Sequence, residues 1–174
     1  SASVARHDGQ LDQSLARAAR LESELQGART INLSGLLLDR LNKDPKVFNI
    51  VESEERHLAA RRATLDGTIT ILLQRKDQLE NEIKGLKIQR TSRLEQLEIF
   101  EDELVGLREL FEKGYYPKTK ILAVERAISE LRGAAGNDLA LISRAKSARG
   151  EAENQIVSVR QRFREDAVKQ LRDA

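Results

Sequence analysis

The stretch Leu110-Phe-Glu-Lys-Gly-Tyr-Tyr-Pro-Lys-Thr119 sets the topology of this chain, because it breaks the helical pattern between two long heptad repeats. Glycine supplies the backbone conformation that a tight turn needs, and proline fits the first turn of a following helix. Residues 114–117 are therefore predicted to form a turn with a long helix on each side.

Before this turn, residues 45–113 are predicted to form one continuous helix. Asp44 fits an N-cap and Pro45 fits the first helical position. At 1.5 Å per residue, such a helix would be roughly 100 Å long. Apolar residues occupy most a and d positions over seven heptads, a pattern typical of a coiled coil. The a positions are Ile69, Lys76, Ile83, Arg90, Leu97, Leu104 and Phe111, and the d positions are Leu58, Leu65, Leu72, Leu79, Leu86, Arg93, Phe100 and Leu107.

After the turn, the repeat resumes in residues 118–174. Two heptad helices joined by a short turn must lie antiparallel, because neither can bury its apolar seam alone. The predicted fold is therefore all-α, a long antiparallel coiled-coil hairpin. The apolar positions of this second helix are Ile121, Val124, Ile128, Leu131, Ala135, Ile142, Ala145, Ala152, Ile156, Val159 and Phe163.

Folding the chain about residue 114 also predicts a register for the two helices. It sets Leu107 level with Ile121, and it brings two polar interruptions into matching pairs: Arg90 with Asp138, and Arg62 with Asp166. Each buried Leu or Ile contributes about 1.5–3 kcal/mol, whereas an exposed ion pair contributes at most about 1 kcal/mol. We therefore expect the apolar layers to hold the hairpin together and the charged pairs to select its register.

Residues 1–44 are predicted to thicken the base of the hairpin. A first helix over residues 2–26 ends at Gly27, and residues 36–41 form a short helical turn that packs back on it. Because the helix before the turn is longer than the helix after it, we expect the first helix beside the start of the longer one, with residues 27–44 returning the chain and both chain ends at the base. The whole chain is then one hairpin domain. The apolar stripe expected on the first helix is Val4, Leu11, Leu15, Ala18 and Leu25.

The composition agrees with a coiled coil and argues against several other classes. Charged residues make up 33% of the chain and aromatic residues 3%, a profile typical of long helices. The 30 basic and 28 acidic residues are interleaved, which argues against a nucleic-acid groove. Without cysteine, disulfide and thiol chemistry are excluded. No apolar run is long enough for a bilayer and no signal peptide is found.

Since the chain contains no Met, we expect an excised piece of a larger protein, with Ser1 and Ala2 as a cloning remnant.

No active site is predicted. His7 and His57 are far apart in sequence and belong to no metal-binding spacing, and the glycines are scattered singly rather than gathered in a phosphate-binding loop. We therefore expect no catalytic residues, no metal, no cofactor and no small-molecule substrate. Gly133-Ala-Ala-Gly136 is either a site of gentle bending or a small-residue patch where another hairpin approaches.

The turn carries the strongest sign of a binding role. Tyr115 and Tyr116 are the only two tyrosines of the chain, and nothing about folding requires two exposed rings there. Tyrosine is enriched at contact surfaces, because it combines apolar area with a polar group. The turn with Leu110, Gly114 and Pro117 is thus the predicted partner-docking end. The alternative is a turn without a binding role.

Several runs of the chain, in order, resemble the membrane fusion proteins of type I secretion systems, of the hemolysin D-type and protease-exporter branch. The segment quoted above around the turn is the most similar, and the resemblance covers essentially the whole chain. The other runs are Asp44-Pro45, Glu54-Glu-Arg-His-Leu58, Ile83-Lys-Gly-Leu-Lys-Ile-Gln89, Leu97-Glu-Ile-Phe-Glu-Asp-Glu-Leu104, Leu122-Ala-Val-Glu-Arg126, Leu131-Arg-Gly-Ala-Ala-Gly136 and Glu153-Asn-Gln-Ile156.

This resemblance implies the helical hairpin of a periplasmic adaptor, anchored in the inner membrane of a Gram-negative bacterium beside an ABC transporter. The hairpin would reach a TolC-like outer-membrane channel, and the full-length protein would assemble as a homo-oligomer, a ring of six. Lipoyl-like and β-barrel domains, absent from this chain, would contact the transporter. Related drug-efflux adaptors dock their channel through an Arg, a Leu and a Ser. Here Leu110 takes the Leu position, Pro117 stands where the Ser falls, and Gly106 replaces the Arg, with Arg108 nearby.

Two other functions remain open from the residues alone. One is a cytoplasmic coiled-coil scaffold or tether that dimerises through its helices. The other is a regulatory arm of an enzyme whose catalytic domain lies outside this chain. Membrane-anchor and lipoyl sequences flanking the hairpin would distinguish the adaptor from both.

Overall fold

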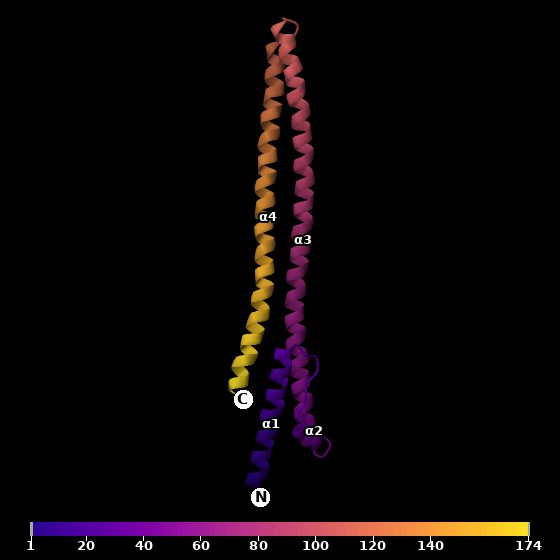
Figure 1. Cartoon of the computed structure of the whole chain (residues 1–174), viewed down its shortest axis with the longest axis vertical. Helices are drawn as coiled ribbons and strands as arrows, with labels where there is room; N and C mark the ends of the chain where they lie inside the picture. Colours follow the sequence, from indigo (N-terminus) through magenta and orange to yellow (C-terminus); the bar gives the residue numbers. More distant parts are fainter. Residues whose placement is uncertain (1, 174) are drawn as a thin grey trace. The chain divides into compact units, whose positions relative to one another are not determined.

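A computed structural model of the chain describes residues 2–173, with side chains described from His7 onward. These residues form four helices and no strand: α1 (Ala2–Gln26), α2 (Gly35–Leu41), α3 (Pro45–Glu112) and α4 (Lys118–Arg172) (Figure 1). The chain divides into two compact units. Unit 1 comprises Ser1–Leu72 with Asn154–Ala174, and unit 2 comprises Leu73–Glu153. The all-α hairpin predicted from the heptads is confirmed.

Local sequence sets both ends of α3. The backbone N–H of Lys46 donates to the Asp44 carboxylate at 2.9 Å, so Asp44 is the predicted N-cap. The helix ends at Glu112, one residue before the predicted end. Gly114 follows with φ +79°, and the N–H groups of Gly114 and Tyr115 donate to the carbonyls of Phe111 and Leu110, both at 2.9 Å. This is a Schellman C-cap, in which the glycine takes the left-handed conformation.

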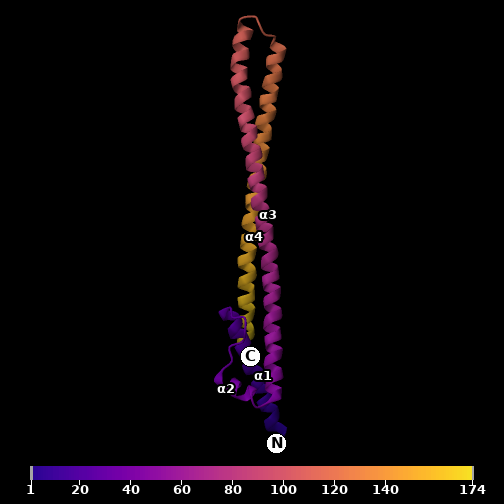
Figure 2. The same cartoon turned by 90° about the vertical axis from the view of Figure 1, so that its right-hand side faces the viewer.

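In unit 2, α3 and α4 run antiparallel and wind about each other (Figure 2). Leu79 and Ile83 of α3 pack with Ile142 and Ala145 of α4. Nearer the turn, a second cluster forms around Leu104, Ile121 and Ile128, and the residues packed against it are Leu97, Phe100, Leu107, Tyr116 and Val124. Except for Tyr116, which belongs to the turn, these residues occupy the apolar positions of the two predicted repeats, so the seam lies where the heptads place it.

The predicted pairing of Arg90 with Asp138 is wrong. The Asp138 carboxylate accepts from Nη1 of Arg93 at 2.9 Å, and the same nitrogen lies 3.1 Å from the carbonyl of Ala134. Side chains on a helix lean toward its N-terminus, so the guanidinium of Arg93 reaches back toward the level of residue 90. Nε of Arg90 is buried without a hydrogen-bond partner.

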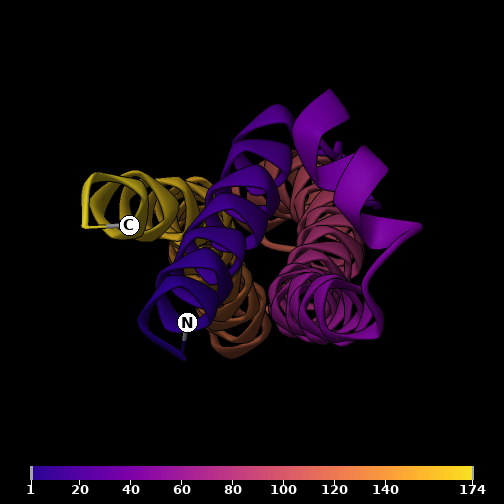
Figure 3. The ribbon, with the colours of Figure 1, turned by 90° about the horizontal axis from the view of Figure 1, so that it is seen from below.

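In unit 1, α1 and the start of α3 run in the same direction, and residues 27–44 carry the chain from the end of α1 back to the start of α3. Viewed from below, α1 lies between the C-terminal turns of α4 and the pair formed by α2 and the start of α3 (Figure 3). Ala16, Leu37, Val47 and Val51 form the apolar core where α1, α2 and α3 meet.

The apolar stripe predicted on α1 holds only in part. Leu15 packs against the apolar core, but Leu11 is 48% exposed, and most of the fully buried residues described on this helix are polar. The side chain of Val4 lies outside the described part of the chain. Charged partners on α2 and α3 surround α1, which allows its polar side chains to be buried. The buried residues of α1 are Asp12, Ala16, Arg20, Leu21, Ser23 and Glu24.

Candidate docking surfaces

The two tyrosines of the turn have different environments. Tyr115 is 79% exposed. Tyr116 is half-buried, packs against the apolar cluster of unit 2 nearest the turn, and has Nζ of Lys120 at 5.8 Å from its ring centroid. The prediction of two exposed rings therefore holds for Tyr115 alone. Tyr116 packs at the end of the apolar seam, whereas most of the Tyr115 side chain is exposed to solvent.

Further apolar side chains are exposed next to this turn. Leu110 and Phe111 are each 42% exposed, Leu122 is 44% exposed, and Pro117 is also exposed. We refer to Leu110, Phe111, Tyr115 and Leu122 as the turn surface. A hollow of about 290 Å³ lies beside it, bounded by the ion pair between Arg108 and Glu125 at 2.8 Å. Exposed apolar area with charges at its edge is the composition of a protein contact surface.

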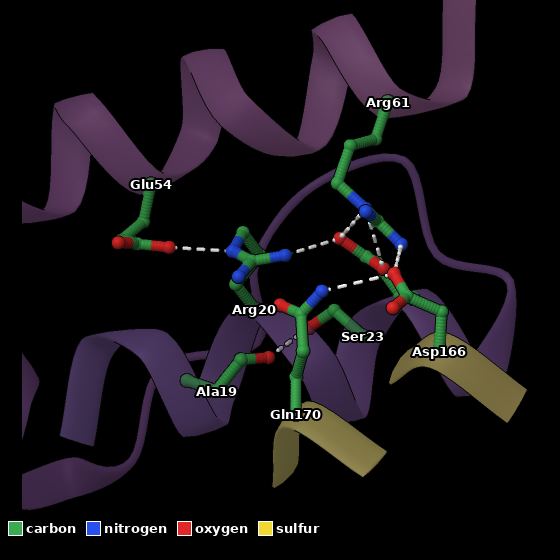
Figure 4. Close-up of polar contacts among 8 residues, drawn as sticks. Ala19, Arg20, Ser23, Glu54, Arg61, Asp166 and Gln170 are labelled. Carbon is green, nitrogen blue, oxygen red and sulfur yellow. Dashed lines mark hydrogen bonds and ion pairs between the residues drawn. The ribbon is translucent and has the colours of Figure 1, made fainter. Parts of the chain in front are cut away.

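A cluster of polar side chains in unit 1 joins α1, α3 and α4 (Figure 4). Arg20 of α1 is 1% exposed and pairs with Glu24 of the same helix and with Glu54 of α3. Arg61 of α3 lies 3.2 Å from Glu24 and 2.8 Å from Asp166 of α4. Its guanidinium also sits 5.1 Å from the ring centroid of Phe163. Arg61 therefore connects α1 to α4.

The pKa of Asp166 is lowered from its ordinary value of 3.8, chiefly because Arg61 donates a hydrogen bond to it, with a smaller contribution from Gln170. Burial acts in the opposite direction and is outweighed. Asp166 is thus held in its charged form, which favours the contact between α3 and α4.

The predicted partner of Asp166, Arg62, is wrong by one residue. Arg61 pairs with Asp166 instead, because the buried Glu24 of α1 also attracts Arg61. The predicted register considered only the two long helices and did not include α1. Arg62 is directed instead toward the end of α1, where a Cβ built on Gly27 would lie 3.5 Å from its Nη2. The sequence analysis named Asp166 as half of an ion pair but missed the other members of the cluster, although the i, i+4 spacing of Arg20 and Glu24 was a visible sign of it.

Neither surface resembles a catalytic centre. Among the described residues, no three His, Cys, Asp or Glu side chains gather to hold a metal ion. Within the same part of the chain, every helix is too short or too polar to cross a membrane. The turn surface consists of exposed apolar side chains with an ion pair at its edge, whereas the cluster of unit 1 is a largely buried network that joins three helices.

The family model described as "AprE, long alpha-helical hairpin" matches residues 1–174, so the chain belongs to this family. The type I secretion system membrane fusion protein PrsE of Rhizobium meliloti (strain 1021) is 31% identical over 172 residues, which cover 99% of this chain and 39% of PrsE. The chain therefore spans about two-fifths of the length of this relative.

A solved structure gives the same fold. The crystal structure of the soluble domain of LipC, a membrane fusion protein of a type I secretion system, matches with a TM-score of 0.92 at 24% identity. The match covers 99% of this chain and 80% of the LipC chain. The resemblance to type I secretion membrane fusion proteins that the sequence predicted is thereby confirmed.

Proposed function

We propose that this chain is the helical-hairpin arm of a periplasmic adaptor, which links an inner-membrane ABC transporter to a TolC-like outer-membrane channel during type I protein secretion. The observation that carries the proposal is the turn surface, an exposed apolar patch that closes two long helices in a chain of the AprE hairpin family. The role is mechanical rather than catalytic.

The length of α3 and its packing against α4 suit this role. α3 has 68 residues, which corresponds to about 100 Å at 1.5 Å per residue. A helix of this length, braced by α4 through an apolar seam, is a spacer, and the turn at its end is the place where a partner is met. Several such hairpins in a ring, six in our proposal, would surround a passage for the exported protein.

Docking of the channel is assigned to the turn surface together with Gly114 and Pro117. Gly114 and Pro117 shape the turn, while Tyr115 and Leu110 offer their side chains. The other partner, the ABC transporter, is assigned to domains outside this chain. The full-length adaptor would accordingly be anchored in the inner membrane of a Gram-negative bacterium and project into the periplasm.

The turn is tested by replacing Tyr115 with Ala in the full-length adaptor and measuring export of its cognate substrate. Loss of a hot-spot tyrosine costs about 2 kcal/mol of binding, so we expect roughly 30-fold weaker docking and little export. Far-UV circular dichroism should stay unchanged, because Tyr115 lies outside the seam.

The matched control is Ile71→Ala, which removes a side chain of similar exposure, 67%, from α3 in unit 1. We expect this variant to export normally. A photocrosslinker at position 115 should also capture the outer-membrane channel in living cells. Normal export by Tyr115→Ala would refute the assignment of the turn.

A further inference from the structure

Unit 1 contains a hollow of about 650 Å³ that the proposed function does not use. It lies at the end of α1, between α3 and α4. Its basic lining comes from three segments: Arg29 of the connection after α1, Arg62 of α3, and Arg160 and Arg164 of α4. We refer to this site as the arginine hollow.

The four guanidinium groups of this hollow are not neutralised within the chain. None of them forms an ion pair with any side chain that the structure describes, although Arg20, Arg61 and Arg93 all do. Nε of Arg62 is buried without a hydrogen-bond partner. A buried donor without an acceptor costs free energy, which an incoming acceptor recovers.

The carboxylates that line the hollow do not balance this positive charge, and Glu165, which lies beside Arg160 and Arg164 in the neighbouring hollow, accepts a hydrogen bond from Gln161. Glu24 lines the hollow, but Arg20 and Arg61 already hold it. Asp66 also lines it and forms no ion pair with a described side chain. Four arginines thus face a single carboxylate that is not already paired, and the hollow attracts negative charge.

The size and lining of the hollow indicate what kind of anion it fits. A volume of about 650 Å³ is in the range of sites for extended ligands, of about 300–1,000 Å³, and far exceeds what a single inorganic ion fills. Between the arginines lie the half-buried side chains of Leu65, Ile69 and Phe163. A complementary ligand therefore carries several carboxylates together with an apolar group.

A lipid surface fits this lining less well. Insertion into a membrane requires apolar side chains that project outward, whereas those of the hollow are recessed among the arginines. Planar guanidinium groups instead match the geometry of carboxylates, which they bind through two parallel hydrogen bonds.

We propose that the arginine hollow binds an acidic peptide segment of a partner protein, one with at least two carboxylates beside an apolar side chain. This interaction is separate from the docking at the turn, because the hollow and the turn belong to different units of the chain. The adaptor arm then has two contact sites of different chemistry, one apolar and aromatic, the other basic.

The proposal is tested with a fluorescently labelled synthetic peptide of glutamate and leucine, titrated with the whole chain at low ionic strength and followed by anisotropy. Arg160→Gln combined with Arg164→Gln removes two exposed charges of the hollow without touching the core. We expect this double variant to bind the peptide at least about 10-fold more weakly, since contacts between close charge pairs carry much of such binding. Added salt should weaken wild-type binding in the same direction.

A matched control removes the same number of charges elsewhere. Arg126→Gln combined with Arg144→Gln changes two exposed arginines of α4 in unit 2, outside the hollow, and should alter the peptide affinity by less than about twofold. Arg62→Gln tests the buried nitrogen, and its circular dichroism is compared with that of the wild type.

Three outcomes would overturn the proposal. One is equal peptide binding by the Arg160/Arg164 double variant and the wild type. Another is equal affinity for a neutral peptide with glutamine in place of glutamate. The last is binding to vesicles of anionic phospholipid, dependent on Arg160 and Arg164, in the absence of peptide binding. None of these results bears on Tyr115 or on export through the turn.

Discussion

At the scale of single residues, Arg20 is the largest of the fully buried side chains that the structure describes. It is almost fully buried on α1, yet it pairs with two carboxylates from two helices. A buried charge is tolerated when its partners satisfy it, and it becomes costly when one partner is removed. Arg20 therefore makes the position of α1 depend on Glu24 and Glu54 rather than on apolar contact alone.

Replacing Arg20 with Ala should destabilise unit 1 by about 3 kcal/mol, because Glu24 would stay buried with one partner fewer. The measurement is urea unfolding followed by circular dichroism. Arg56→Ala is the control, since its pair with Glu52 at 3.6 Å is exposed and should be worth less than about 1 kcal/mol. Equal effects of the two substitutions would show that the buried cluster has no special weight.

Tyr115 and Tyr116 show how far sequence can place a candidate binding residue. Their types and their position in a turn were enough to predict a docking end. Which ring faces outward could not be predicted, because that depends on the seam, where Tyr116 packs near Leu104 and Ile121. The arginine hollow left no sequence signal, since Arg29, Arg62 and Arg160 are brought together only by folding.

At the scale of helices and turns, Gly114 is the residue that ends α3. Its φ of +79° is disfavoured for other residues, and no atom lies within 4 Å of a Cβ built there. Gly114→Ala should therefore destabilise the hairpin by about 1–2 kcal/mol through the backbone alone.

The matched control for this substitution is Gly106→Ala. Gly106 lies inside α3, again with no atom within 4 Å of an added Cβ, so the substitution should stabilise the helix by roughly 0.5–1 kcal/mol. Thermal unfolding of both variants measures the difference. A melting temperature that changes in the same direction for both would contradict the capping role of Gly114.

In unit 2, the apolar seam is interrupted by the ion pair between Arg93 and Asp138. We expect the stability of this layer to depend on the two residues being present together. Asp138 is 2% exposed and accepts from Arg93. Arg93→Leu should cost about 3 kcal/mol, because it leaves a buried carboxylate without its partner. Combining it with Asp138→Leu should recover most of that loss, because the double variant extends the apolar seam.

The recovery is measured with a double-mutant cycle of urea unfolding free energies. Arg132→Leu serves as a control, since its pair with Glu101 is exposed and its loss should cost less than about 1 kcal/mol. Additive effects of Arg93→Leu and Asp138→Leu would argue against the pairing.

The helices themselves were largely predictable. The heptads, the Asp44 cap and the glycine-proline turn gave the bounds of α3 and α4 to within a residue or two, because these signals are local. The partners of Asp138 and Asp166 were not, since they depend on how arginine side chains lean along a helix and on the presence of α1. The polar buried face of α1 was not predicted, because apolar periodicity cannot reveal a helix face that is held by ion pairs.

At the scale of the whole molecule, the two units differ in how many helices protect α3. In unit 1, residues 54–61 of α3 are joined to both α1 and α4 through Glu54 and Arg61. In unit 2, α3 packs against α4. Amide hydrogen exchange should therefore be about 10-fold or more slower in residues 54–61 than in residues 90–97.

Arg20→Ala offers an internal check on this prediction. It should speed exchange in residues 54–61, because α1 is then held less firmly, and it should leave residues 90–97 unchanged. Mass spectrometry of peptic fragments resolves the two segments. Uniform exchange along α3 in the wild type would argue against a more stable unit 1.

Because Asp44 caps the start of α3 and Gly114 belongs to the C-cap that follows Glu112, local sequence fixes the length of this helix at both ends. An insertion into one helix alone would shift the register, so that the apolar residues beyond it would no longer face their partners on the other helix. Growth must come in whole heptads, one in each helix, and each matched pair adds about 10 Å. Homologues whose hairpins are longer or shorter should accordingly differ by such steps, and engineered hairpins of other lengths should be built the same way.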